Sequence, residues 1–322
     1  MSDTGYQLIA FGGLLAELRA QPSSQNSLSF NCALGDGPAN AIRAASRLGC
    51  RTALYGKIGE DPLGAALEKL LLEDGVDLQN LVRSPTAPTD TALVSEREEG
   101  AFRRVYYGGC AGVGAGTGEF DLHPIARSGF LCFGSDALAQ RNSREAALRL
   151  ARYAAGHGCT VVFSPGLHLE MWKTEGEEAA RQWCREAMKL AGIVKVTTGE
   201  LDFLADVSDP DRAADRLMLQ YRPRLLLVSL GGEGCLFRSV YGDLRIPGFP
   251  AEAPAERDAG EDVFTGAFLG RLASNGKALV ECGIGDIAAC AVFANAARAI
   301  AAETGRMPRL AEVEEFLRQR LI

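Results

Sequence analysis

Residues 35–76, GDGPANAIRAASRLGCRTALYGKIGEDPLGAALEKLLLEDGV, predict a helix, a buried strand and a second helix in direct succession. A proline near the first turn and a glycine at the end indicate that the first helix spans 38–49. The apolar run 52–59 is typical of a buried strand followed by a turn. Leucines at helical spacing, stopped by a glycine, predict a helix over 61–75. This order is typical of an α/β fold.

Outside this stretch, short apolar runs continue to alternate with longer helical patterns such as 143–158. The apolar runs predict buried strands over 6–13, 130–134, 160–165, 193–197 and 224–231. Because these runs show no internal alternation of apolar and polar residues, both faces of each strand are expected to be covered. The predicted fold class is therefore α/β, with a doubly wound, mostly parallel sheet and helices on both of its faces.

Two segments break this pattern. Residues 13–34 and 89–112 contain alternating apolar and polar positions, which predict exposed antiparallel strands. They are separate in the sequence but alike in pattern, so we expect them to pair into a small β-sheet lid over one edge of the main unit. The sequence has no internal repeat and no clear interdomain linker, so residues 1–322 are predicted to form one domain with an inserted lid.

The composition is ordinary for a soluble globular protein, with 47% apolar and 23% charged residues among 322. A net charge of −7 argues against nucleic acid as a partner, because such a binding face needs clustered Lys and Arg. The first residues show no secretory signal and no window approaches an apolar membrane span, so we expect a cytoplasmic protein without a membrane partner. Nine scattered cysteines and three histidines favour free buried thiols over a metal site.

A second informative stretch is AERDAGEDVFTGAFLG, residues 255–270, where a turn at Gly260 leads through Glu261 and Asp262 into an apolar helix. The N-terminus of a helix suits phosphate, and an aspartate there can take a proton from a hydroxyl during phosphoryl transfer. Position alone favours a plainer interpretation of Asp262, a structural acid in the first helical turn. Glu261 adds a second negative charge where phosphate would sit, and two like charges about 4 Å apart repel by about 4 kcal/mol at an effective dielectric of about 20.

Three stretches, 35–76, 228–237 (VSLGGEGCLF) and 258–272 (DAGEDVFTGAFLGRL), resemble in order the signatures of the ribokinase-like, or PfkB-type, carbohydrate kinase family. Residues 163–172 and 193–204 resemble its fructokinase and 2-keto-3-deoxygluconate kinase branch. The resemblance implies a doubly wound sheet with a β lid that often forms a homodimer clasp. It also implies transfer of the ATP γ-phosphate to a hydroxyl of a small sugar or sugar acid with Mg²⁺, a monovalent cation being an optional addition.

The resemblance implies that Asp262 is the catalytic base, with Ala259, Gly260 and Glu261 in place of the family's Gly-Ala-Gly phosphate cradle. Aligned from the upstream side instead, Glu261 would take the base position; the longer downstream match, DVFTGAFL, favours Asp262. On the nucleotide side, the implied contacts are Thr197, Glu200, Ser229, Gly231, Gly232, Gly234 and Asn295. The resemblance also implies that Glu200 organises magnesium. On the substrate side, the implied contacts are Glu17, Asp36, Asn40, Arg104, Ser164 and His168.

The family pattern is changed at several ligand positions, where the residues found are Glu17, Asp36, Gly108, Ser164, Gly166, His168, Thr197 and Glu261. Two hypotheses follow, a kinase with a drifted active site and a pseudokinase that keeps the fold but acts through ligand binding or assembly. The retained Asp262, Asn40 and Glu200 favour the kinase. A nucleoside kinase is disfavoured by the fructokinase-like residues 163–172.

Each candidate also has a purely structural interpretation. Glu200 could be a helix-start carboxylate, and Asn40 a capping or core amide. Glycine loops after strands, such as the one around Gly231, are common and weak evidence alone. For Lys195 and Arg104, a solvated surface position is the default expectation, although either could contact phosphate or sugar.

Overall fold

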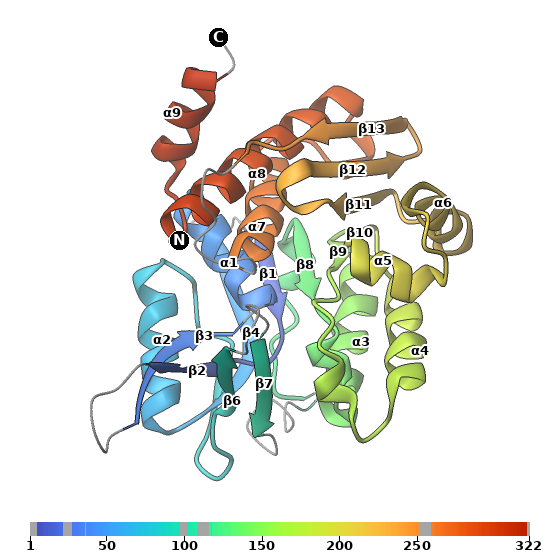
Figure 1. The fold of residues 1–322 in the computed structure, drawn as a ribbon. Coiled ribbons are helices and arrows are strands. Elements are labelled where there is room, and N and C mark those ends of the chain that lie inside the picture. Colours follow the sequence, from blue (N-terminus) through green and yellow to red (C-terminus); the bar gives the residue numbers. More distant parts are fainter. Residues whose placement is uncertain are drawn as a thin grey trace.

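The computed structural model describes residues 5–21, 28–35, 37–96, 102–107, 116, 118–250 and 259–320. Within them the main feature is a nine-stranded sheet (Figure 1). Its strands in spatial order are β13 (Gly242–Pro247), β12 (Gly234–Ser239), β11 (Leu225–Ser229), β10 (Ile193–Thr197), β9 (Thr160–Phe163), β8 (Phe130–Phe133), β1 (Leu8–Phe11), β4 (Thr52–Gly59) and β5 (Leu81–Ser84). Every neighbouring pair from β11 to β5 is parallel, and β12 and β13 add an antiparallel edge.

Helices cover both faces of this sheet, so the predicted fold class is confirmed. The helices, in chain order, are α1 (Pro38–Arg47), α2 (Pro62–Glu73), α3 (Arg141–Gly156), α4 (Glu177–Met188), α5 (Thr198–Ala205), α6 (Pro210–Tyr221), α7 (Ala259–Ala273), α8 (Ile284–Thr304) and α9 (Leu310–Arg320). One apolar cluster joins the sheet to α1, α2, α7, α8 and α9, and a second joins it to α3, α4, α5 and α6. In β1, Leu8 belongs to the first cluster and Ile9 to the second, which explains why the strand sequences do not alternate.

A separate four-stranded sheet has the order β3 (Ser29–Leu34), β2 (Leu15–Gln21), β6 (Asp90–Glu96) and β7 (Phe102–Tyr107). Figure 1 shows it apart from the main sheet and in front of β4. The pairs β2–β3 and β6–β7 are antiparallel, but the central pair β2–β6 is parallel. The strands come from both segments expected to form a lid; the single-domain boundaries and the lid's function stay predictions.

The expectation that no segment is apolar enough to span a membrane was wrong. By length and composition alone, α8 (Ile284–Thr304) qualifies as a candidate span. In the structure, 61% of its most apolar window is buried, and its side chains form part of the main core against α7 and the β12–β13 edge. A helix that is apolar on all sides is expected in the centre of a large core, and this explains its composition.

Two glycines allow α7 to pack directly on α1. A Cβ atom built at Gly266 would lie 2.0 Å from the carbonyl oxygen of Ala41, and one at Gly270 would lie 2.9 Å from the Cys50 sulfur. Both distances are shorter than any real contact, so the backbones approach as closely as they do only because side chains are missing there. The depth at which α7 sits, and therefore the position of its first turn, depends on this contact.

We expect Gly266→Ala to lower the free energy of unfolding by about 1–3 kcal/mol, because the added methyl group forces α7 away from the α1 carbonyl. Gly285→Ala is the matched control, since nothing lies within 4 Å of its Cβ position in α8. Urea unfolding of both variants and the parent chain measures the difference. Equal stability of Gly266→Ala and the parent would contradict the close packing.

Candidate active site

A cavity of about 240 Å³ opens where the carboxyl ends of β8, β9 and β10 meet the N-termini of α1, α5 and α7. Ligands of open parallel sheets bind at this end of the strands. The cavity brings together many of the predicted site residues, and those that line it are Arg104, Ser164, His168, Thr197, Glu200, Glu261 and Asp262. These residues come from segments far apart in the sequence, so their meeting is a result of the fold.

Asp262 lies in the first turn of α7, and its Oδ2 accepts a hydrogen bond of 2.8 Å from the backbone N–H of Gly37. Gly37 caps α1 and has a φ of 128°, a backbone conformation that favours glycine. The N-termini of two helices therefore converge on one carboxylate. Both carry partial positive charge, which stabilises a negative group between them.

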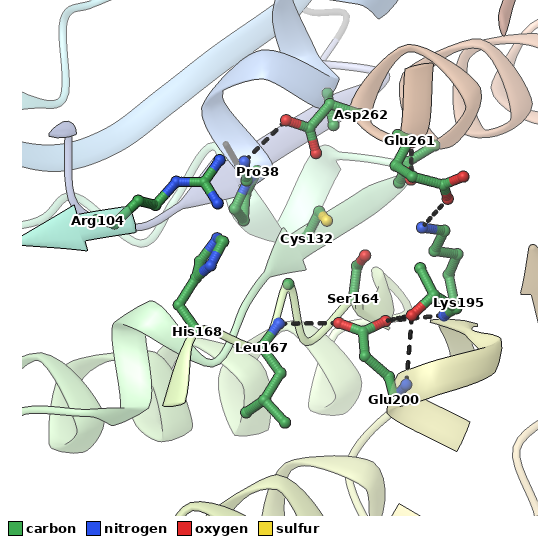
Figure 2. Close-up of a pocket in the computed structure, with 15 residues that line it drawn as sticks. Pro38, Arg104, Cys132, Ser164, Leu167, His168, Lys195, Glu200, Glu261 and Asp262 are labelled. Atoms are coloured by element: carbon green, nitrogen blue, oxygen red, sulfur yellow. Dashed lines mark hydrogen bonds and ion pairs between the residues drawn. The ribbon is translucent and has the colours of Figure 1, made fainter. Parts of the chain in front are cut away.

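Glu261 is directed away from Asp262, as Figure 2 shows. Its Oε2 accepts a hydrogen bond of 2.9 Å from Lys195 Nζ, and its Oε1 accepts one of 2.9 Å from Ser229 Oγ. The Nε of Arg298, on α8, lies 3.5 Å from Oε1. Burial alone would raise the pKa of Glu261, but the charge of Lys195, the hydrogen bonds from Lys195 and Ser229, and the charge of Arg298 together hold that pKa below its ordinary value.

The default expectation that Lys195 is a solvated surface residue was wrong. It is the third residue of β10, only 4% of its surface is exposed, and its ammonium group pairs with Glu261. Burial would lower the pKa of Lys195, but the nearby charges of Glu261 and Glu200 outweigh burial and raise it. No pattern in the sequence indicated a role for Arg298, because it lies on a mostly apolar helix 37 residues after Glu261 and matches no motif.

Glu200 and Thr197 form a capping box at the start of α5. The Glu200 Oε2 accepts hydrogen bonds from the Thr197 N–H at 2.8 Å and from the Thr197 hydroxyl at 3.1 Å, while its Oε1 accepts one of 2.9 Å from the Leu167 N–H. Glu200 therefore fills the structural role considered for it, and it also lines the cavity. Carboxylate oxygens have further lone pairs, so these bonds leave a role toward a metal-bound water open.

On the side of the small sheet, Arg104 and Glu17 face each other. The Arg104 Nε lies 3.0 Å from Glu17 Oε1, and Arg19 reaches Glu17 Oε2 at 3.2 Å. Glu17 is 1% exposed and only 14% of the Arg104 side chain is exposed, so the default expectation of a solvated Arg104 was also wrong. The pair joins β2 to β7 and places a guanidinium group on the cavity wall.

Comparison with known proteins gives a family for this arrangement. Residues 6–306 match the description of a pfkB family carbohydrate kinase. The chain belongs to this family. Fructokinase-1 of Zea mays is 31% identical over 319 residues, which cover 96% of this chain and 96% of that protein. Fructokinase-1 of Oryza sativa subsp. japonica is 30% identical over 318 residues, which cover 97% of this chain and 96% of that protein.

Solved structures show the same fold. A fructokinase from Xylella fastidiosa with bound ATP has a TM-score of 0.89 and 24% identity, and the match covers 98% of this chain and 100% of that one. A fructokinase from Vibrio cholerae O395 in a fructose, ADP and calcium ion bound form has a TM-score of 0.83 and 24% identity, with 97% and 99% coverage. The resemblance of the sequence to the ribokinase-like kinases is thereby confirmed.

A second cavity of about 220 Å³ adjoins the first in this member of the family, and both are lined by Gly37, Pro38, Gly166 and His168. It lies below β6 and β7 of the small sheet, and its wall includes Asp90, Tyr106 and Asp136.

Asp136 was not among the predicted site residues, although a polar residue three positions after the end of the parallel strand β8 could have suggested it. Burial raises the pKa of its carboxyl group, against hydrogen bonds from the backbone of Ala137 and Gly13.

Other predicted site residues lie outside both cavities. The Asn40 amide donates to the carbonyl oxygens of Gly35 at 3.1 Å and Leu34 at 3.4 Å, and its oxygen accepts from Arg43 at 2.9 Å. This is the structural amide considered as its alternative. The Asn295 amide donates to the Pro247 carbonyl at 3.1 Å. Among the predicted site residues whose side chains the structure describes, those that do not line either of the two cavities are Glu17, Asn40, Ser229, Gly231, Gly232, Gly234, Gly260 and Asn295.

For three residues named in the sequence analysis, the structure describes only the backbone or nothing. Asp36 and Gly108 are outside the described residues, and for Ala259 only the backbone is described. Of the family's cradle, Ala259, Gly260 and Glu261 form the first residues of α7. A Cβ atom at Gly260 would lie 3.0 Å from Arg298 Cγ, so this glycine makes room for the arginine that approaches Glu261.

We expect Glu261→Gln to lower the free energy of unfolding at pH 7 by about 3 kcal/mol, because Lys195 loses its buried partner. The folded-state pKa of Glu261 lies below the ordinary 4.5, so its stabilising contribution is present above about pH 4.5 and is lost as the pH falls through the folded value. The pKa of Lys195 is raised above 10.5, so its contribution is present below that pH and is lost as the pH rises through the raised value.

Urea unfolding at pH 7 and pH 4 tests this prediction. The difference in the free energy of unfolding between parent and variant should be smaller at pH 4. The matched control is Glu315→Gln, which removes an exposed pair with Arg318 on α9 and should cost less than about 0.5 kcal/mol. A difference in the free energy of unfolding that stays constant over this pH range would contradict the role given to the Glu261 charge.

Proposed function

We propose that this chain is an ATP-dependent kinase that transfers the γ-phosphate to a hydroxyl of a small sugar or sugar acid, with Asp262 as the general base. The observation that carries the proposal is the position of Asp262, on the cavity wall and bonded to the N-terminus of α1, while Glu261 is directed elsewhere. Membership of the carbohydrate kinase family supports the reaction type. Fructokinases with bound ATP, or with fructose and ADP, are among the proteins of the same fold.

Glu261, the carboxylate next to Asp262, does not repel phosphate in the way that its position in the sequence suggests. Glu261 has two cationic neighbours, Lys195 at 2.9 Å and Arg298 at 3.5 Å. One negative and two positive charges leave this group with a net positive charge. A phosphate at the start of α7 would therefore meet attraction from the group as a whole, where a lone Glu261 would repel it.

The chemistry asked of Asp262 is to accept the proton of the attacking hydroxyl as the bond to phosphorus forms. The hydrogen bond from the Gly37 N–H and the two helix N-termini favour the ionised carboxylate, which is the form that a base needs. A positioned base of this kind contributes about 10²–10⁴-fold to the rate. In this family fold, positioning and charge stabilisation supply the rest.

The residues present fit a magnesium ion held largely through water and phosphate. Among the described residues no group of three or more His, Cys, Asp or Glu side chains is placed to hold a metal, and Mg²⁺ commonly takes one or two carboxylates with waters and substrate phosphates. Glu200, on the cavity wall, is the carboxylate we propose for it. When bound, the ion would neutralise charge on the phosphate oxygens.

The second cavity, under the small sheet, is the site we propose for the sugar. It adjoins Asp262 through the shared Gly37 and Pro38, so a hydroxyl could reach the base from there. We also propose that the small sheet joins two copies of the chain. Its edge strand β3 is mostly exposed, and Leu28 and Phe30 present 86% and 42% of their surfaces to solvent.

A pseudokinase is the second candidate, and specific observations favour it. Asn40 is held by backbone carbonyls and Arg43, and both Glu200 oxygens accept hydrogen bonds within the protein. Two residues expected to touch ligand are thus engaged structurally. A chain of this kind would keep its ligand cavity without transferring phosphate.

We expect Asp262→Asn to lower the rate of sugar phosphorylation by about 10²–10⁴-fold, because the amide cannot accept the proton. The measurement is ADP release with Mg-ATP and a panel of neutral sugars and sugar acids. Sugar binding, measured by calorimetry, should change little, since the amide keeps the shape of the carboxylate. Asp215→Asn, at an exposed position on α6, is the matched control and should keep the parent rate.

Turnover by Asp262→Asn at the parent rate would show that the base lies elsewhere. If the parent chain phosphorylates no sugar and shows no thermal shift with Mg-ATP, the kinase proposal fails. A thermal shift with a sugar alone would then support the pseudokinase.

A further inference from the structure

Three donors from three different elements meet at the Glu261 carboxylate. They are Lys195 on β10, Ser229 at the end of β11 and Arg298 on α8, at 2.9, 2.9 and 3.5 Å. No two of these elements are consecutive in the chain, although β10 and β11 pair in the sheet, so the convergence is built by the tertiary fold. Two cations and a hydroxyl around one point are the donor set that binds oxyanions.

The exposed fractions show which member of the group faces the cavity. The Glu261 side chain is 25% exposed and that of Lys195 6%, while Ser229 as a residue is 2% exposed. Glu261 and Lys195 both line the cavity that contains Asp262. Glu261 is therefore the most exposed member of the group, ahead of Arg298 at 15%, and a ligand in the cavity reaches its side chain more readily than the buried ammonium.

The fit between donors and carboxylate is incomplete. Arg298 Nε is buried and makes no hydrogen bond within the described part of the chain, because its 3.5 Å contact with Glu261 lacks hydrogen-bond geometry. Buried donors of this kind normally have a partner. A carboxylate offers two oxygens to three donors, whereas a phosphoryl group offers three oxygens.

Arg298 also connects the two glycine turns of the site. A Cβ atom at Gly260 would lie 3.0 Å from Arg298 Cγ, and one at Gly231 would lie 3.6 Å from its Nη2. The guanidinium group thus lies between the first turn of α7 and the turn that follows β11. An anion bound there would touch the start of α7 and the loop after β11 together.

We infer that Lys195, Ser229 and Arg298 form a binding site for a phosphoryl oxyanion, and that Glu261 occupies it as an intramolecular competitor. The site takes the terminal phosphate of a polyphosphate chain, and the Glu261 side chain must leave the donors for that phosphate to bind. The identity of this anion as the ATP phosphate rests on the proposed function, but the anion site itself rests on the three donors alone.

The test is binding of inorganic tripolyphosphate to the full chain, measured by calorimetric titration without sugar. Glu261→Gln removes the competing charge and should bind tripolyphosphate at least about tenfold more tightly than the parent. Its melting temperature should start lower and should rise more with tripolyphosphate than that of the parent. The control is Glu315→Gln on α9, which should bind like the parent chain.

Two further variants keep the test decisive. Lys195→Met combined with Glu261→Gln should show no gain, since the principal donor is gone. Should Glu261→Gln fail to fold, Glu261→Asp keeps the charge but draws it back from the donors, and it should bind at least about threefold more tightly.

Equal or weaker tripolyphosphate binding by a folded Glu261 variant would overturn the inference, because it would make Glu261 a support for Lys195 and not a competitor. A gain that persists in the double variant would overturn it too. Tighter binding without any sugar phosphorylation would uphold the anion site while the proposed kinase function fails.

Discussion

The ion pair between Lys195 and Glu261 fixes the first turn of α7 to the end of the main sheet, and the arrangement of the cavity depends on it. Successive residues of an α-helix point about 100° apart, so a Glu261 side chain held toward β10 leaves Asp262 to face another direction. That direction is the N-terminus of α1, where the Gly37 N–H is 2.8 Å away. The orientation of the candidate base is thus set by its neighbour's partner. A buried ammonium group without a carboxylate partner would strongly destabilise the fold, so Lys195 requires Glu261 or another anion beside it.

The second constraint is the depth of α7 against α1. Gly266 and Gly270 let the backbones of the two helices approach closely, and this brings both N-termini to the same place. Each N-terminus alone is a weak anion site, but two that converge on the Asp262 carboxylate together favour a negative group at that point of an acidic protein. A net charge of −7 therefore gives no indication of the potential in this cavity.

Much of the fold could be predicted from the sequence, because strands buried on both faces have a characteristic apolar pattern and the helices between them have clear ends. Residues 52–59 and 193–197 match β4 and β10 residue for residue. The parallel pairing of β2 with β6 could not be predicted, since partner choice between distant strands has no local signal. The place of α8 could not be predicted either, because a helix in the centre of a large core has the same apolar composition as a membrane span.

The candidate site was predictable only in part, for a related reason. Asp262, Glu200 and Thr197 follow strand ends or begin helices, and those positions are visible in a sequence. Lys195 and Arg298 carry the charges that decide how Glu261 behaves, yet a lysine in a strand and an arginine in a helix are ordinary by themselves. Their importance arises from contact with a residue 66 positions away in one case and 37 in the other.

These contacts change the interpretation of Glu261. Viewed alone, a glutamate in a phosphate cradle is a loss, and loss is what a pseudokinase would accumulate. Viewed with Lys195, Ser229 and Arg298, it is one member of a matched set, in which a buried cation has its counter-charge and a partly buried carboxylate its donors. Unconstrained drift would more readily leave a buried charge unpaired, which is costly, than supply two cations and a hydroxyl from three elements. The coupling of these four residues therefore favours a site that still handles anions over one that has ceased to do so.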